Sequence, residues 1–261
     1  MSYAVTVPLL AIPKTKEDFF MFYSLMLYNA VTDEAGNIAS YVPTTLGNVL
    51  LIAILAALLV GAILFAKKYA AAQNKENEDT PAKSGQLTVR QLVFCAMSLA
   101  LGTLLSEIKI IDFPWGGSAT LLSMLIICLP GYLFGLGAGL LTGVAYGVLQ
   151  IIIDPYILFP LQLVMDYLLA FGALGLSGLF ASSKNGLIKG YLLGILGRYI
   201  FVVLSGCIFF AEYAWEGWPV VPYSLVYNGI YIFAEAAVTL VLLAIPAVRK
   251  GIGAIKKMAL S

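Results

Sequence analysis

The sequence predicts an all-α integral membrane protein, a bundle of six helices preceded by one extra N-terminal transmembrane helix. Of the 261 residues, 61% are hydrophobic and 11% are charged, which lies far outside the composition of a water-soluble domain. The mean hydropathy is +0.94. The apolar residues fall into stretches of about 20 residues, the length that a helix needs to cross the hydrocarbon core of a bilayer.

Seven apolar stretches with few charges mark the predicted spans. Their bounds are 47–66, 90–111, 119–134, 136–153, 161–181, 190–210 and 224–248. Very short turns, such as Leu133 to Gly135, separate the second and third spans from their neighbours, so composition fixes those boundaries only to within several residues.

A charged linker divides the chain. Residues 67–88, rich in Ala, Asn, Lys and Glu, cannot bury a core and are predicted to be solvated. The expected organisation is therefore an outer N-terminal segment 1–46, the extra transmembrane helix 47–66, this linker, and a six-helix domain over 89–257.

Basic residues predict the orientation, since Lys and Arg gather in cytoplasmic loops. They follow the first span, precede the second, separate the fifth from the sixth and follow the last: Lys67, Lys68, Lys83, Arg90, Lys184, Lys189, Arg249, Lys250, Lys256 and Lys257. The loops on the other side carry acidic residues and almost no basic ones. We therefore expect the N-terminus outside the cell and the C-terminus in the cytoplasm.

Composition excludes several functions. The chain has no histidine, which removes the commonest general base and zinc ligand. Its three cysteines lie singly in apolar runs and are predicted to be buried hydrophobes: Cys95, Cys128 and Cys207. A net charge of +1 without a basic block gives no footprint for nucleic acid. These absences exclude most hydrolytic mechanisms, and we expect neither a metal nor a cofactor.

The loops predicted to face outside hold several aromatic residues, which suit either an interfacial belt or a binding site. They are Trp115, Tyr156, Tyr213, Trp215, Trp218 and Tyr223. Polar side chains reach the same level: Asp166 is expected about 7 Å, Asn228 about 6 Å and Gln150 about 4 Å below the outer helix ends. A carboxylate in a spanning helix is costly and indicates function, and an acid below aromatic rings favours a cation.

Two further patterns concern contacts between helices. Arg198 and Glu235 are expected at matching depth in the last two spans, about 18 and 17 Å from the outer ends, and are predicted to form an ion pair. Ala96 and Ala100 in the second span form a small-xxx-small pattern that lets another helix approach closely. That helix belongs either to the same bundle or to a partner subunit.

Three stretches resemble the thiamine-specific substrate-binding (S) subunits of energy-coupling-factor (ECF) transporters. They are PWGGSATLLSM (114–124), LVMDYLLAFGALGLSGLFASS (163–183) and EYAWEGWPVVPYSLVYNG (212–229). Their order and spacing also fit, and the resemblance covers residues 88 to 257. In that family, aromatic side chains, an acid and an asparagine hold the vitamin near the outer surface.

The resemblance places these roles on Trp115, Tyr156, Asp166, Tyr167, Tyr223 and Asn228. Phe210 stands where members have a stacking tryptophan, and the depth of Gln150 adds it to the candidate site. Asp166 replaces a glutamate of some members and keeps the charge. A pocket histidine of some members aligns with Val202, which cannot form a hydrogen bond.

The resemblance implies a high-affinity thiamine-binding subunit of an ECF-type ABC importer in the cell membrane. Its implied partners are a transmembrane coupling subunit, contacted through Ala96 and Ala100, and two ATPases, since the chain has no G-x-x-x-x-G-K-[ST] loop. Val202 leaves a thiamine precursor or another small cationic heterocycle open as ligand. Two other classes of protein are the alternatives. One is a membrane enzyme that uses Asp166 or Asp154 as its acid or base, and the other is a channel or self-sufficient transporter.

Overall fold

The structure is a computed structural model that describes residues 28–32, 38–46, 49, 87–113, 117–154, 156 and 158–261. The predicted helix 47–66 and linker 67–88 lie outside the described residues, apart from Val49, Leu87 and Thr88. By its contacts the chain divides into two compact units. The first comprises Met1–Lys68 with Val203–Tyr227, and the second comprises Tyr69–Val202 with Asn228–Ser261.

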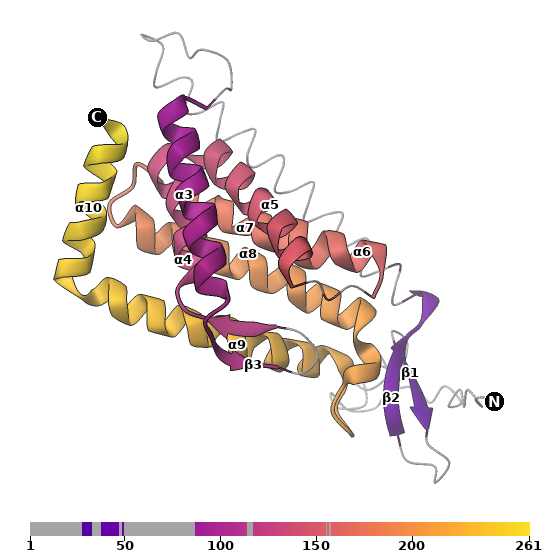
Figure 1. Ribbon diagram of the computed structural model, residues 1–261. Coiled ribbons are helices and arrows are strands. Elements are labelled where there is room, and N and C mark those ends of the chain that lie inside the picture. Colours follow the sequence, from indigo (N-terminus) through magenta and orange to yellow (C-terminus); the bar gives the residue numbers. More distant parts are fainter. Residues whose placement is uncertain are drawn as a thin grey trace. The chain divides into compact units, whose positions relative to one another are not determined.

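Five helical segments among the described residues are long and apolar enough to cross a membrane. They are α3 (Val89–Ser106), Leu161–Phe180, α5 (Leu136–Ile153), α8 (Gly186–Phe209) and α9 (Val220–Ala244). A shorter apolar helix, α4 (Ser123–Phe134), completes the predicted frame of six. In the second unit α3, α4 and α5 pack against one another (Figure 1). The helical membrane fold predicted from the sequence is thereby confirmed.

A short β-hairpin occupies the end of one predicted span and the start of the next. The predicted spans 90–111 and 119–134 are both too long, because β3 (Lys109–Asp112) pairs antiparallel with β4 (Ser118–Thr120). The sequence of β3, KIID, contains two β-branched residues, which favour a strand. Gly117 has φ +85°, and its carbonyl accepts the Phe113 N–H at 3.2 Å. This hydrogen bond closes the connection between the two strands.

The first unit holds a second hairpin that the sequence did not predict. β1 (Tyr28–Thr32) pairs antiparallel with β2 (Ile38–Pro43). β2 runs beside η3 (Ala211–Tyr213), a short 3-10 turn between α8 and α9. Part of the predicted outer segment 1–46 therefore has regular structure.

The span 161–180 is a chain of four helical pieces. α6 (Pro160–Leu163) leads into the π-helical η1 (Val164–Leu169), and α7 (Ala170–Ala173) leads into the 3-10 helical η2 (Leu174–Phe180). Such departures from α-helical geometry are frequent at functional sites. The irregular turn η1 carries Asp166, the carboxylate that the sequence singled out.

Glycines at every fourth position of α5 bring this irregular span close. A Cβ on Gly143 would lie 2.5 Å from the Phe171 carbonyl oxygen, and one on Gly147 would overlap the Tyr167 carbonyl. Gly139, one turn earlier, is equally crowded by backbone. Small residues at this spacing let two helix backbones approach in a membrane. The position of η1 against α5 therefore depends on residues without side chains.

A buried carboxylate from α9 caps the start of α4. Glu235 is 1% exposed, and its oxygens accept four hydrogen bonds from the end of β4 and from the first residues of α4. The donors are the backbone N–H groups of Thr120 (3.1 Å) and Met124 (2.9 Å) and the hydroxyls of Thr120 (2.7 Å) and Ser123 (3.3 Å). Leu122, the N-cap residue of α4, provides no side-chain cap. Glu235, which belongs to α9, caps the N-terminus of α4 instead.

The predicted ion pair between Arg198 and Glu235 is wrong. Both ion pairs found in the described part of the chain belong to Lys109. Glu235 is engaged by the donors named above, and the Arg198 guanidinium lies over the Phe171 ring, 4.4 Å from its centroid. Equal depth on two helices did not determine where the side chains point. A ring face provides part of the stabilisation of the half-buried guanidinium of Arg198.

The last predicted span, 224–248, is shifted, and a further helix follows it. α9 ends at Ala244, whose carbonyl accepts a hydrogen bond from Arg249 (3.1 Å). Pro246 then starts α10 (Pro246–Leu260), which suits a proline because the first helical N–H needs no partner. α10 lies against α3 and α4 (Figure 1).

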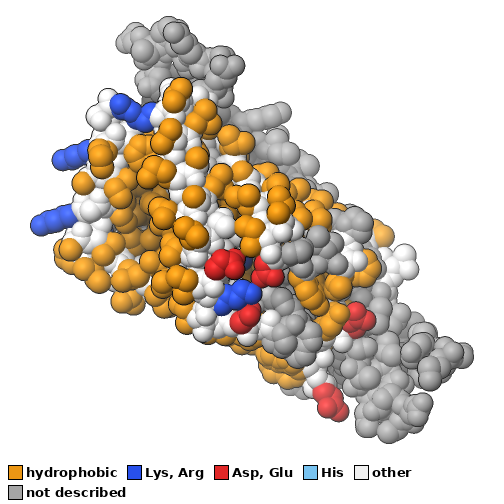
Figure 2. All heavy atoms as spheres, in the orientation of Figure 1, with side chains coloured by type: hydrophobic (Ala, Val, Ile, Leu, Met, Phe, Trp, Pro, Cys, Tyr) orange, Lys and Arg blue, Asp and Glu red, His pale blue; other side chains and the backbone are white. Residues whose placement is uncertain are grey.

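The surface is apolar where a bilayer would meet it. Large side chains exposed on the spans include Leu104 at 66%, Ile152 at 71% and Val241 at 67%. Figure 2 shows hydrophobic side chains over most of one face, with Lys and Arg along the α10 edge. A patch of this extent is foreign to a soluble monomer and suits lipid.

Substituting the capping carboxylate tests its importance. We expect Glu235→Gln to lower the unfolding free energy by about 2 kcal/mol, because one amide oxygen cannot serve four donors and its NH2 opposes some of them. Thermal unfolding of the purified protein in detergent measures the loss. Glu212→Gln, exposed in η3, is the matched control and should leave the midpoint unchanged. An equal midpoint in both variants would contradict the capping role.

Candidate substrate-binding site

Asp166 is held in place by a buried glutamine one turn earlier. The Gln162 side chain, 1% exposed, donates to Asp166 Oδ2 at 2.7 Å. The same amide donates to the Tyr156 carbonyl (3.0 Å) and accepts the Leu158 N–H (3.1 Å). One side chain thus joins the carboxylate to the loop that precedes its helix. Asp166 itself is half-buried, which strengthens its interaction with a charged partner.

Tyr167 holds the same loop through its hydroxyl. The oxygen accepts the Tyr156 N–H at 2.7 Å and donates to the Asp154 carbonyl at 3.2 Å. The ring is buried and packs near Phe171, with centroids 6.4 Å apart. The phenol group of Tyr167 therefore places the loop that carries Tyr156, a structural role beside the binding role that the sequence suggested.

Asn228 belongs to a chain of contacts beneath the β3–β4 turn. Its side-chain oxygen accepts a hydrogen bond from the Tyr231 hydroxyl at 2.7 Å, and both residues are buried. The Tyr231 ring lies against Gly117 and is 6.2 Å from the Phe113 ring. Trp115, which stands between β3 and β4 in the sequence, lies outside the described residues. The turn on both sides of Trp115 is therefore anchored to the helix that carries Asn228.

Gln150 has a partner on another helix. Its amide nitrogen donates to the Ser106 hydroxyl at 3.1 Å, and that hydroxyl donates to the Thr103 carbonyl at 2.7 Å. These bonds tie the end of α5 to the end of α3. Gln150 is buried. The contact gives Gln150 a structural task beside the binding role that the sequence suggested.

Charges at the end of α5 pair with the hairpin. Lys109 contacts the carboxylate of Asp154 at 2.9 Å and that of Asp112 at 3.5 Å. The hydrogen bond to Asp154 raises the pKa of Lys109 above its ordinary value; burial opposes this shift, and the two carboxylate charges reinforce it. Asp154 therefore serves as an ion-pair partner on the surface, which weakens its candidacy as an enzymatic acid or base.

Aromatic rings form a connected series in the first unit. The Trp215 ring meets that of Trp218 at 5.1 Å and that of Tyr223 at 5.2 Å, both edge to face. Tyr223, 2% exposed, also packs on Tyr227 at 5.4 Å. Phe210 pairs separately with Tyr213, at 5.9 Å. Two of the sequence-predicted rings, Tyr223 and Phe210, are thus positioned by other aromatic residues.

Three residues of these contacts escaped the sequence analysis. Gln162 lies four residues before Asp166, and Tyr231 lies three residues after Asn228. Both are spacings at which side chains meet on a helix, so a search for polar neighbours would have found them. Tyr227, four residues after Tyr223, follows the same rule. Val202 is buried in α8, as an apolar residue at this position allows.

The described residues hold polar groups suited to binding. No group of three or more metal-ligating side chains occurs among them. A held carboxylate, a buried carboxamide and aromatic rings in apolar spanning helices can bind a small solute by charge, hydrogen bonds and ring contacts. These features define a multi-pass membrane protein that binds a solute.

Comparison with known proteins gives the particular family. The family model of the thiamine transporter protein (Thia_YuaJ) matches residues 92–252. The chain is 35% identical to the thiamine transporter ThiT of Bacillus subtilis over 178 residues, which cover 61% of this chain and 92% of that protein. The chain therefore belongs to the thiamine transporter protein family, and its role is transport rather than catalysis.

Two further likenesses agree. The chain is 28% identical to the thiamine transporter ThiT of Lacticaseibacillus paracasei over 121 residues, which are 40% of this chain and 60% of that one. A solved structure of ThiT from Listeria monocytogenes has 26% identity and a TM-score of 0.50, covering 60% of this chain and 96% of that chain. The range that the family model matches, residues 92–252, lies within the domain 89–257 predicted from the sequence.

Removing the link between Asp166 and its loop tests the site. We expect Gln162→Leu, of similar size, to lower the unfolding free energy by about 1 to 3 kcal/mol, since the Leu158 N–H and Asp166 both lose a partner. Hydrogen exchange of the Tyr156 and Leu158 amides should accelerate. Gln150→Leu is the control and should leave those two amides unchanged. Equal exchange in both variants would contradict the positioning role of Gln162.

Proposed function

We propose that this chain captures thiamine at the outer face of the cell membrane, as the high-affinity S component of an ECF-type importer. The observation that carries the proposal is Asp166, a half-buried carboxylate held by Gln162 in a spanning segment of a thiamine transporter. A carboxylate in such a place attracts a cation strongly, because its surroundings screen its charge less than water does. A cationic solute can therefore bind beside Asp166 while Gln162 keeps the carboxylate in place.

The chemistry of thiamine matches the candidate side chains. Its thiazolium ring carries a permanent positive charge, which a carboxylate and aromatic faces attract. Its aminopyrimidine ring has donors and acceptors for a carboxamide such as that of Asn228. The proposed contacts are Trp115, Tyr156, Asp166, Phe210, Tyr223 and Asn228. Tyr167 and Gln150 act mainly by supporting this set, through their bonds to the loop and to α3.

The proposed orientation puts the N-terminus outside and the C-terminus in the cytoplasm. The distribution of charge supports it: α10 carries four basic residues and no acidic residue, whereas Asp112 and Asp154 lie at the other end of α3 and α5. Asp166 then lies toward the outside, where a vitamin arrives. The domain boundaries proposed are those expected from the sequence, with the six-helix domain over 89–257.

The partners proposed are a transmembrane coupling subunit and two ATPases. Ala96 and Ala100 are exposed on α3, whereas Cys95, Ser98 and Gly102 on the opposite side are buried. A small-residue face pointing away from the bundle supports a contact with another membrane helix. This observation favours a partner over packing within the bundle.

A related ligand is the second candidate. Val202, buried and apolar, offers no hydrogen bond where some members have a histidine. A thiamine precursor or another small cationic heterocycle can lack the polar group that such a histidine would bind. Such a ligand loses less affinity than thiamine when valine stands at this position. Competition between thiamine and such compounds for the purified protein, followed by quenching of tryptophan fluorescence, separates the two ligands.

Neutralising Asp166 tests the cation site. We expect Asp166→Asn to weaken thiamine binding about 10- to 150-fold, because a charge-assisted contact contributes about 1.5 to 3 kcal/mol. The amide keeps the shape and an oxygen for Gln162, so the unfolding midpoint should change little. Titration with thiamine measures the affinity.

A neutral thiamine analogue is the matched ligand control for this substitution. Because it has no thiazolium charge, it should lose much less affinity than thiamine on Asp166→Asn. If charged and neutral ligands weaken equally, or neither weakens, Asp166 is structural and the cation site must lie elsewhere.

Enlarging the exposed face of α3 tests the partner contact. We expect Ala96→Leu with Ala100→Leu to abolish uptake in cells that have the coupling subunit and ATPases, while the isolated protein still binds thiamine. Exposed positions tolerate the larger side chains without disturbing the bundle. Leu92→Ala with Leu104→Ala, also exposed on α3, gives a control for general changes of this helix. Loss of thiamine binding in the Leu variant would assign Ala96 and Ala100 to internal packing.

A further inference from the structure

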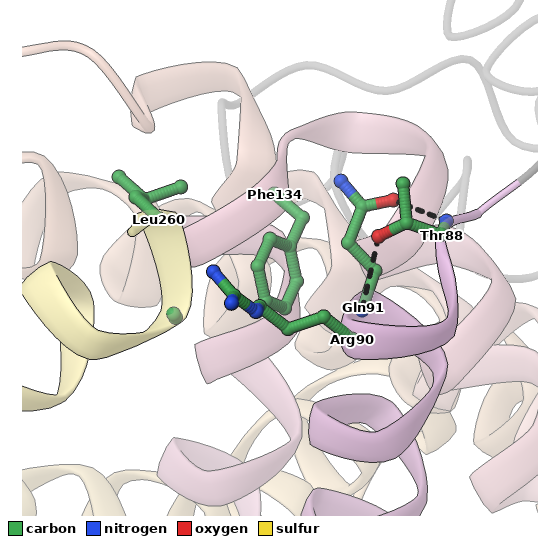
Figure 3. Close-up of a pocket in the computed structure, with 6 residues that line it drawn as sticks. Thr88, Arg90, Gln91, Phe134 and Leu260 are labelled. Carbon is green, nitrogen blue, oxygen red and sulfur yellow. Dashed lines mark hydrogen bonds between the residues drawn. The ribbon is translucent and has the colours of Figure 1, made fainter.

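A groove at the basic end of the helices lies apart from the candidate binding site. It encloses about 380 Å³ between the start of α3, the end of α4 and the end of α10. Its lining is Thr88, Arg90, Gln91, Phe134, Ala259 and Leu260. Figure 3 shows the Arg90 side chain reaching past the Phe134 ring toward Leu260. The groove therefore combines one cationic group with apolar walls.

The polar groups around Arg90 are already in use. Thr88 and Gln91 form a capping box at the start of α3, with bonds of 2.9 Å and 3.3 Å between their backbone and side-chain groups. Arg90 is exposed and forms neither an ion pair nor a hydrogen bond with the residues that the structure describes. Its five N–H donors suit a phosphate, which they bind as a planar fork.

The walls are fixed in place. The Phe134 ring meets Phe94 edge to face at 5.8 Å. On the other side, Lys256 ties α10 down: its ammonium group donates to the Ala181 carbonyl at 2.6 Å and lies 4.0 Å above the Tyr132 ring. A groove built from anchored elements is present before any occupant arrives, which lowers the entropic cost of binding.

The surroundings place the groove at the level of lipid headgroups. α3 begins at its rim and is apolar enough to span the bilayer. α10 carries Arg249, Lys250, Lys256 and Lys257 without any acidic residue, and it exposes Met258 (63%) and Leu260 (59%). Basic amphipathic helices of this kind lie in the membrane interface. Figure 2 shows basic side chains along this edge.

We infer that this groove binds one anionic phospholipid, with its phosphate on Arg90 and the start of an acyl chain along Phe134 and Leu260. A cation beside apolar walls at the end of a spanning helix matches such a molecule in charge, polarity and depth. A zwitterionic lipid gains less, because its own cation competes for the phosphate. A soluble anion would gain nothing from the apolar walls.

Native mass spectrometry of the delipidated full-length protein tests the site. Phosphatidylglycerol and phosphatidylcholine with identical acyl chains are added separately, and inorganic phosphate is added in a third series. We expect phosphatidylglycerol to bind at least about 10-fold more tightly than phosphatidylcholine, and Arg90→Gln to remove that preference. Lys250→Gln is the matched control: it removes a charge from the same end of the molecule, outside the groove, and should keep the preference.

Each other outcome overturns the inference. Equal losses in Arg90→Gln and Lys250→Gln would assign the preference to general surface charge. Displacement of phosphatidylglycerol by equimolar phosphate would reduce the groove to a simple anion site. If the protein does not prefer phosphatidylglycerol to phosphatidylcholine, a protein partner is the occupant instead. In that case Arg90→Gln should weaken binding of the coupling subunit. Thiamine binding should be unchanged in both variants, which shows that they fold and separates this test from that of the proposed function.

Discussion

The carboxylate of Glu235 is the constraint on which the arrangement of the second unit depends. It belongs to α9 yet holds the first backbone groups of α4 and the end of β4. A carboxylate near a helix N-terminus is favoured both by the unpaired N–H groups and by the helix dipole, and inside a bilayer no water replaces it. The hairpin before α4 is therefore fixed to α9 rather than left as a loose connection.

The same face of α9 continues this constraint toward the candidate site. Asn228, Tyr231 and Glu235 are spaced by three and four residues, so they lie on one side of the helix. Tyr231 supports the β3–β4 turn from below, and Glu235 holds its far end. The β3–β4 hairpin is in this way joined to the helix that carries Asn228, by the hydrogen bonds of Glu235 and by the ring contacts of Tyr231. The candidate binding residue Asn228 and the neighbouring hairpin are therefore positioned by the same face of α9.

Length and hydropathy predicted the six helical segments, because the bilayer imposes a minimum apolar length that sequence alone reveals. They did not predict the β3–β4 hairpin or α10, since a strand of β-branched residues and an amphipathic helix both resemble the continuation of a span. Depth along the helices singled out Asp166 and Asn228. It failed for Arg198 and Glu235, because depth does not determine the direction in which a side chain points.

The glycine spacing of α5 was visible in the sequence and predicts a close helix contact, yet the π-helical turn opposite it was not predictable. That turn depends on how the Tyr167 carbonyl fits against Gly147, which is a property of the packed structure. The neighbours of Asp166 and Asn228 at helical spacing were, in contrast, within reach of a simple pattern search. What remained hidden was the loop that Gln162 and Tyr167 hold.

The bonds from Tyr167 to that loop go to main-chain atoms alone, the Tyr156 N–H and the Asp154 carbonyl. Every residue except proline offers the same N–H, and every residue offers the same carbonyl. Neither bond therefore depends on which side chain stands at 156. An exchange of that side chain to suit a different solute would leave both bonds to Tyr167 in place, so this part of the frame and the specificity of the receptor can change separately.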